Sequence, residues 1–258
     1  MSWVRLNDEL LAPLMLFLGP VEAGCVSFTE KLIHHHHLSL PSRRPFSVVV
    51  RLERGLSVTG AILQNLSGLY YPVLDPAKPV VEQEAVRRLA RSSRQLYSIM
   101  GRAQDVTALE NALMRPPVQY LEYHLMSQAE APPEVPLPRL PRDMTIREAA
   151  PDEARYLFDI QKKYEIEEVL LPGNTFSPTA TMHHLRETLR EQVVLVAEIE
   201  RTPVGKANTN ARGVFYDQIG GVFTERALRS RGIGTGLMLR LLKRIASSRK
   251  PDRPNIFK

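Results

Sequence analysis

The chain has 258 residues, a length that suits two domains of ordinary size better than one small module. Hydrophobic residues make up 43% of it and charged residues 24%, which excludes a disordered or fibrous protein. The net charge of +6 at pH 7 favours an anionic partner such as a nucleic acid, an acidic membrane surface or a polyanionic cofactor.

The single cysteine, Cys25, excludes a disulfide framework and a thiolate-rich metal site within one chain, so we expect a cytoplasmic protein. The apolar stretch at residues 10–18 contains Pro13 and is far shorter than the roughly 20 residues of a membrane span. We interpret it as an amphipathic opening helix and expect no membrane span. The four histidines at 34–37 are interpreted as an exposed turn or helix end, and no metal is expected.

A proline-rich stretch at residues 131–142 divides the chain, because its prolines exclude a helix or a central strand. It predicts a linker between an N-terminal domain at 1–130 and a C-terminal domain at 143–258.

The N-terminal domain begins with β-branched and aromatic runs separated by short turns, which is typical of an antiparallel meander. Helical periodicity and further apolar runs follow. The predicted elements are strands at 46–51, 57–64 and 68–73, a helix at 81–93, a strand at 95–100, a helix at 104–114 and a strand at 118–126.

A similar order returns after the linker. The predicted elements are a strand at 144–147, helices at 151–164 and 182–191, strands at 193–199, 203–211 and 218–224, and a long helix at 232–247. Both halves are therefore predicted to have a mixed α/β fold in which an antiparallel meander feeds helices.

A glycine-rich loop joins the last strand to the long helix. Gly232 and Gly234 allow a phosphate to approach the main chain, and a helix N-terminus has unpaired N–H groups and partial positive charge. Arg229 and Arg231 flank the loop, so we expect it to bind a pyrophosphate. The spacing fits neither a P-loop nor a dinucleotide-binding fingerprint.

The pattern Arg229-x-x-Gly232-x-Gly234, with its strand and helix, resembles the signature of the GNAT N-acetyltransferases over roughly residues 143–250. The segments 206–211 and 218–222 are similar to a bacterial subgroup with a degenerate GNAT-like N-terminal half. The turn at 75–79 has prolines and no glycine, so that half is not expected to bind a pyrophosphate.

The resemblance implies acetyl-CoA as cosubstrate and an unidentified amine as acceptor. It is compatible with an oligomeric state as well as with a monomer. It implies that the last meander strand lends main-chain groups to the pantetheine arm. The expected cofactor-binding residues are Val222, Thr224, Arg229, Arg231, Gly232, Gly234 and Thr235.

In the family the fold continues past the long helix with a strand, a helix and a hairpin. Residues 254–258 look like the start of that strand. We therefore expect a GNAT domain that lacks these final elements, including the tyrosine that usually protonates the CoA thiolate.

The general base is left unassigned. Glu167 and Glu168 lie in the region where the family admits acceptors, and Glu198 lies on a strand, but the structural interpretation is favoured for each, with the first two at a solvated helix end.

Two alternatives to an N-acetyltransferase remain. One is a catalytically impaired relative that binds CoA or a protein partner. The other is a basic nucleic-acid-binding module using residues 226–258, which hold ten basic residues and one acid but lack aromatic interleaving and a DNA-reading motif.

Overall fold

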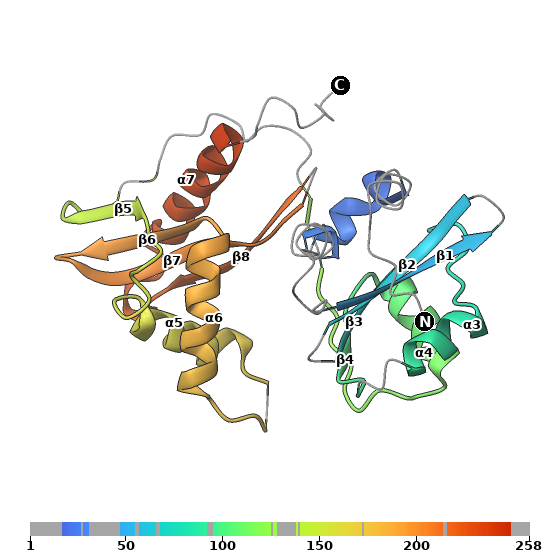
Figure 1. Ribbon diagram of the computed structural model, residues 1–258. Coiled ribbons are helices and arrows are strands. Elements are labelled where there is room, and N and C mark those ends of the chain that lie inside the picture. Colours follow the sequence, from blue (N-terminus) through green and yellow to red (C-terminus); the bar gives the residue numbers. More distant parts are fainter. Residues whose placement is uncertain are drawn as a thin grey trace. The chain divides into compact units, whose positions relative to one another are not determined.

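A computed structural model describes the chain in segments (Figure 1). The described residues are 17–26, 28–30, 47–54, 57–65, 68–91, 95–124, 126–127, 138, 140–171, 173–213 and 216–248. The histidine run at 34–37, most of the linker, most of the opening helix and residues 254–258 lie outside them.

By internal contacts the chain forms two units. One comprises residues 1–127 with 213–216, and the other comprises 128–212 with 217–258.

The first unit holds a four-stranded sheet in the order β1-β2-β3-β4. The first three strands are antiparallel, whereas β4 runs parallel to β3, with a helix in the connection. Its elements are the 3₁₀ helix η1 (Gly19–Gly24), β1 (Ser47–Arg54), β2 (Ser57–Asn65), β3 (Leu69–Leu74), α3 (Gln83–Arg91), β4 (Ser98–Ile99) and α4 (Ala103–Leu113).

Strand β2 is apolar on both faces, because both faces of the sheet are covered. Ala61 and Leu63 pack with Phe28 on one face, whereas Ile62 packs with Leu89 and the helices on the other.

Two predicted strands of this half differ from the structure. The strand expected at 95–100 is reduced to Ser98–Ile99. The strand expected at 118–126 is wrong: its described residues form no strand, and Val118 and Tyr123 are exposed. Its β-branched and aromatic residues have no neighbouring strand to pair with, and strand propensity depends on that packing.

The second unit holds an antiparallel sheet in the order β5-β6-β7-β8. Its elements are β5 (Met144–Glu148), α5 (Phe158–Tyr164), the π-helix η2 (Glu165–Val169), α6 (Pro178–Glu191), β6 (Val194–Ile199), β7 (Thr202–Arg212), β8 (Asp217–Thr224), the 3₁₀ helix η3 (Arg226–Leu228) and α7 (Ile233–Ser248).

Helix α7 covers one face of this sheet, and α5 and α6 cover the other (Figure 1). The alternation along β6 follows from this layering: Leu195 and Ala197 pack with α7, whereas Val194 and Val196 pack with α5 and α6. The predicted mixed α/β class, with a meander feeding helices in each half, is confirmed.

Two helices begin elsewhere than predicted. Residues 151–157 form turns, and α5 begins only at Phe158. Helix α6 begins at Pro178 instead of Met182, because the Ser177 hydroxyl accepts a hydrogen bond from the N–H of Ala180 and proline suits the first helical position.

Candidate active site

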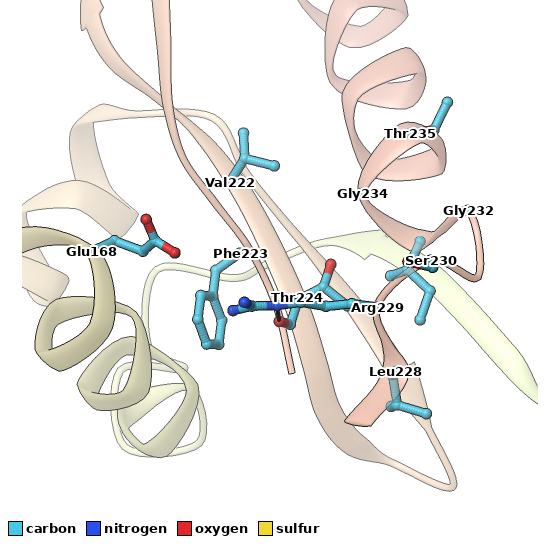
Figure 2. A pocket seen from close by; sticks show the side chains of 11 residues that line it. Glu168, Val222, Phe223, Thr224, Leu228, Arg229, Ser230, Gly232, Gly234 and Thr235 are labelled. Atoms are coloured by element: carbon cyan, nitrogen blue, oxygen red, sulfur yellow. Dashed lines mark hydrogen bonds between the residues drawn. The ribbon is translucent and has the colours of Figure 1, made fainter. Parts of the chain in front are cut away.

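A cleft of about 330 Å³ lies where the end of β8 meets the start of α7, with η2 opposite (Figure 2). Its lining residues are Glu168, Val222, Phe223, Thr224, Leu228, Arg229, Ser230, Gly232, Ile233, Gly234 and Thr235.

All but one of the predicted cofactor-binding residues line this cleft. The exception is Arg231, whose side chain is exposed and lies outside the lining. Four further lining residues are not among those predicted from the sequence, although each lies next to a residue of the motif: Phe223, Leu228, Ser230 and Ile233.

The loop presents a run of main-chain N–H groups. Ser230 and Gly232 both have positive φ, at 62° and 77°, and the first helical hydrogen bond runs from the N–H of Gly236 to the oxygen of Gly232 at 2.8 Å. The N–H groups of residues 233–235 precede that bond and have no acceptor within the helix. Such a helix start, carrying partial positive charge, is suited to an anion.

Gly234 leaves open space on the cleft side of this loop. A Cβ built there would lie 3.8 Å from Thr224 Oγ1, an ordinary contact distance. The protein itself therefore does not require a glycine at this position, although a ligand approaching the main chain would.

A bulge shapes β8 just before the cleft. Lys206 pairs with Phe223 and Asn208 pairs with Gly220, so β8 holds one more residue than β7 over this stretch. Gly221 has a φ of 58° there, and a Cβ on it would come within 2.1 Å of Asn208 Oδ1. The bulge interrupts the ladder and leaves Val222 39% exposed at the cleft.

A row of polar side chains on β7, buried at Lys206 and Asn208 and exposed at Asn210, supports the bulge. Lys206 Nζ donates to Asn208 Oδ1 at 2.9 Å, and Asn208 Nδ2 donates to Asn210 Oδ1 at 3.0 Å. Asn208 lies against Gly221, and Asn210 lies against Gly220. The three polar residues occupy alternate positions, a spacing that places them on one face of a strand. This alternation can be seen in the sequence alone.

Lys206 is only 4% exposed, and its ammonium lies 4.6 Å from the centroid of the Tyr164 ring. Burial lowers the pKa of Lys206 to about 7, and the nearby Glu165 carboxylate opposes part of that shift.

Arg229 is held away from the helix start. Its Nε donates to the oxygen of Thr224 at 3.0 Å, its Nη2 lies 2.6 Å from Glu167 Oε1, and its guanidinium stacks on Phe223 with Cζ 5.4 Å from the ring centroid. Arg229 therefore lines the cleft with its charge paired to Glu167, whereas Arg231 is exposed.

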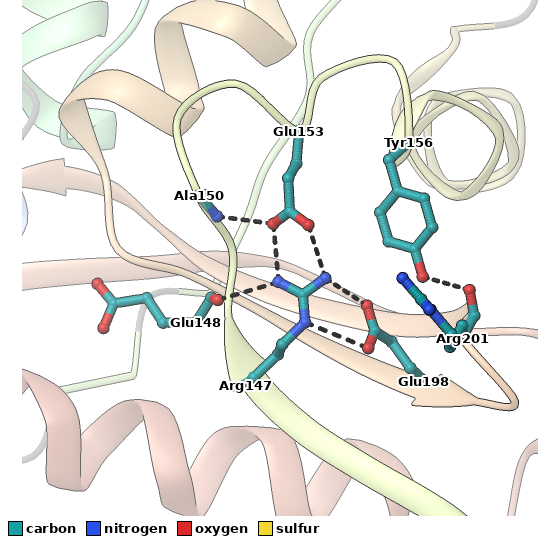
Figure 3. A network of polar contacts seen from close by, with 7 residues as sticks. All are labelled: Arg147, Glu148, Ala150, Glu153, Tyr156, Glu198 and Arg201. Atoms are coloured by element: carbon teal, nitrogen blue, oxygen red, sulfur yellow. Dashed lines mark hydrogen bonds and ion pairs between the residues drawn. The ribbon is translucent and has the colours of Figure 1, made fainter.

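Glu198 has a structural role. Arg147 binds it in a bidentate pair at 2.6 and 3.2 Å, and the same guanidinium binds Glu153 through two hydrogen bonds of 2.7 Å (Figure 3). Glu153 also accepts from the N–H of Ala150, which fixes the turn before α5. Glu198 is 7% exposed and both its oxygens are engaged, so it is unsuited to act as a base.

The described residues contain no group of three or more His, Cys, Asp or Glu side chains that could hold a metal ion. No helix among them is both long and apolar enough to cross a membrane.

Comparison with known families gives one match. Residues 156–250 match the model of the acetyltransferase (GNAT) family, a segment that contains the cleft and its loop. No curated protein matches the chain.

Solved structures give further matches. A protein from Drosophila is 13% identical, with 95% of this chain and 85% of that one covered at a TM-score of 0.62, which shows a shared fold across both halves. A predicted acetyltransferase with acetyl-CoA from Clostridium acetobutylicum is 22% identical, covering 40% and 74% at a TM-score of 0.35. A ribosomal-protein-alanine N-acetyltransferase from Brucella melitensis is 14% identical, covering 40% and 72% at 0.32.

The resemblance predicted from Arg229, Gly232 and Gly234 is thus confirmed for the segment that carries those residues. Residues 156–250 form an acetyltransferase domain of the GNAT family.

Proposed function

We propose that the protein transfers an acetyl group from acetyl-CoA to an amine in the cleft between β8 and α7. The observation that carries this proposal is the open helix start at Gly234 directly beside the bulge at Gly221. The helix start is suited to binding the pyrophosphate of acetyl-CoA, and the bulge is suited to binding its acyl end.

In this proposal the main-chain N–H groups at residues 232–235 hold the pyrophosphate of acetyl-CoA. Arg231 adds charge from the surface, while Arg229 fixes the loop to β8 through the Thr224 oxygen. The pantetheine amides pair with main-chain groups of β8 at Val222 and Thr224, as an added strand would.

With acetyl-CoA bound in this way, its thioester carbonyl lies at the bulge before the acetyl group is transferred. A main-chain N–H freed from the ladder there stabilises negative charge on the carbonyl oxygen as the amine attacks. The amine nitrogen forms the new C–N bond and loses a proton, the C–S bond breaks, and CoA leaves as a thiolate that takes up a proton.

We also propose that residues 143–258 form the catalytic domain, that 131–142 form a linker, and that 1–130 form a degenerate copy. The turn after β3 supports the last assignment. The N–H of Ala77 donates to Asp75 Oδ1 at 2.9 Å, so a carboxylate occupies the place where a phosphate would need positive charge. The expected cytoplasmic location rests on the single cysteine.

The test is an amine panel, comprising ethylamine, trifluoroethylamine, glycine and spermidine, with release of CoA followed by a thiol reagent. Cys25 is buried, and burial raises its pKa to about 12, so the protein thiol should contribute little background. We expect CoA release that depends on both enzyme and amine. Binding of CoA without release for any amine would overturn the proposal and favour a non-catalytic CoA-binding relative.

A further inference from the structure

The π-helix η2 places three glutamates beside the cleft, and they differ in what they contact. Glu165 accepts hydrogen bonds from Gln161 Nε2 at 3.0 Å and from the Thr181 hydroxyl. Glu167 pairs with Arg229 at 2.6 Å. Glu168 lines the cleft, and within the described part of the chain its carboxylate has no hydrogen-bond or ion-pair partner.

The helix geometry explains why neighbouring glutamates separate in this way. The N–H of Leu170 bonds to the oxygen of Glu165, closing a wider π turn that ends the helix. Consecutive residues on a helix point in different directions, so Glu167 turns to Arg229 while Glu168 turns to the cleft. Single π turns of this kind occur frequently at functional sites.

Glu168 faces the part of β8 where the acyl group would lie. Figure 2 shows its side chain reaching from η2 toward the strand that carries Val222 and Phe223. A carboxylate without a partner, across the cleft from the bulge, is placed to meet an amine that approaches the carbonyl.

Other titratable groups near the cleft are engaged or covered. Glu198 is bound by Arg147, and Lys206 lies outside the cleft lining, buried against Tyr164. Glu225 is paired with Lys163.

We propose that Glu168 is the general base of the acetyl transfer and that Glu167 is a positioning residue that holds Arg229 at the end of β8. This inference rests on the proposed function. Glu168 takes a proton from the alkylammonium, and the freed nitrogen lone pair forms the C–N bond while the electrons of the C–S bond leave with CoA. The second proton lost by the nitrogen protonates the CoA thiolate, and the proton on Glu168 passes to solvent.

The sharpest test compares Glu168→Gln with Glu167→Gln on two acceptors of similar shape. Ethylamine is protonated at neutral pH and must lose a proton before it can attack, whereas trifluoroethylamine is largely neutral and can attack directly. Glu168→Gln should lower kcat/KM for ethylamine by roughly two to four orders of magnitude, the usual contribution of a general base, and far less for trifluoroethylamine. Glu168→Asp should restore part of the ethylamine rate.

The matched variant separates this role from a structural one. Glu167→Gln removes the same charge one residue away, and any loss should fall equally on both amines and mainly in the KM for acetyl-CoA. Calorimetry should show the same CoA affinity for Glu168→Gln as for the wild type.

The outcomes distinguish the two proposals. Equal losses on both amines in Glu168→Gln, or no loss, would overturn the assignment of the base while leaving the acetyltransferase proposal intact. Failure of the wild type to acetylate either amine would overturn the proposed function, and the base with it.

Discussion

Replacing Arg147 with methionine is expected to lower the free energy of unfolding by about 3 kcal/mol, because removal of one partner leaves a buried charge uncompensated. Glu198 is 7% exposed and receives both of its charged hydrogen bonds from Arg147. The Arg147 guanidinium also holds the pKa of Glu153 below its usual range, so this part of the stability is present above that range and is lost as pH falls through the lowered pKa. Denaturant unfolding at neutral and acidic pH measures both effects.

Arg244→Met is the matched control. Arg244 also binds a glutamate, Glu148, at 2.6 Å, but the two side chains are 41% and 43% exposed. Solvent screens such a pair, and we expect a change below about 1 kcal/mol. Equal destabilisation by the two variants would contradict the role given to the Arg147 network.

Lys206→Met is expected to change how stability depends on pH. Below pH 7 the wild-type lysine is protonated in both states, and its burial as a cation is unfavourable. Between about pH 7 and its ordinary pKa of 10.5, the unfolded chain binds a proton that the folded chain does not. The free energy of unfolding of the wild type should therefore rise relative to the variant, by up to about 1.4 kcal/mol per pH unit.

The measurement is chemical denaturation of both proteins across this pH range, with Lys243→Met as control. Lys243 lies exposed on α7, so its replacement should give no such pH-dependent difference. A Lys206→Met curve that runs parallel to the wild type would show that Lys206 keeps its ordinary pKa.

The strand, loop and helix of the site could be predicted because their signals are local. Glycine spacing and helical periodicity around Gly232 and Gly234 are read within one short stretch, and the structure places these residues at a helix start beside a cleft. The cap at Ser177-Pro178 is an equally local signal, and the predicted start at Met182 misses it.

The rest depends on contacts between distant residues. Arg229 pairs with Glu167, which lies on a different element, and the sequence around neither residue indicates this contact. The segment 118–126 has the composition of a strand, but its described residues lack a partner to pair with. The alternation of Lys206, Asn208 and Asn210 predicts a shared face, whereas the burial of Lys206 and Asn208 follows only from the packing of α5 and α6.

The binding of CoA to Gly234→Val, measured by calorimetry, tests the central claim most directly. A Cβ at this position would lie 3.8 Å from Thr224 Oγ1, the nearest atom outside the adjoining backbone, so the melting temperature should be close to that of the wild type. The bulk of the added side chain would block the approach of a pyrophosphate to the main chain.

Ala246→Val places the same side chain at an exposed position farther along α7 and serves as the control. We predict that Gly234→Val weakens CoA binding at least about tenfold, or about 1.4 kcal/mol, while Ala246→Val leaves it unchanged. Equal CoA affinity in the wild type and Gly234→Val would contradict the account.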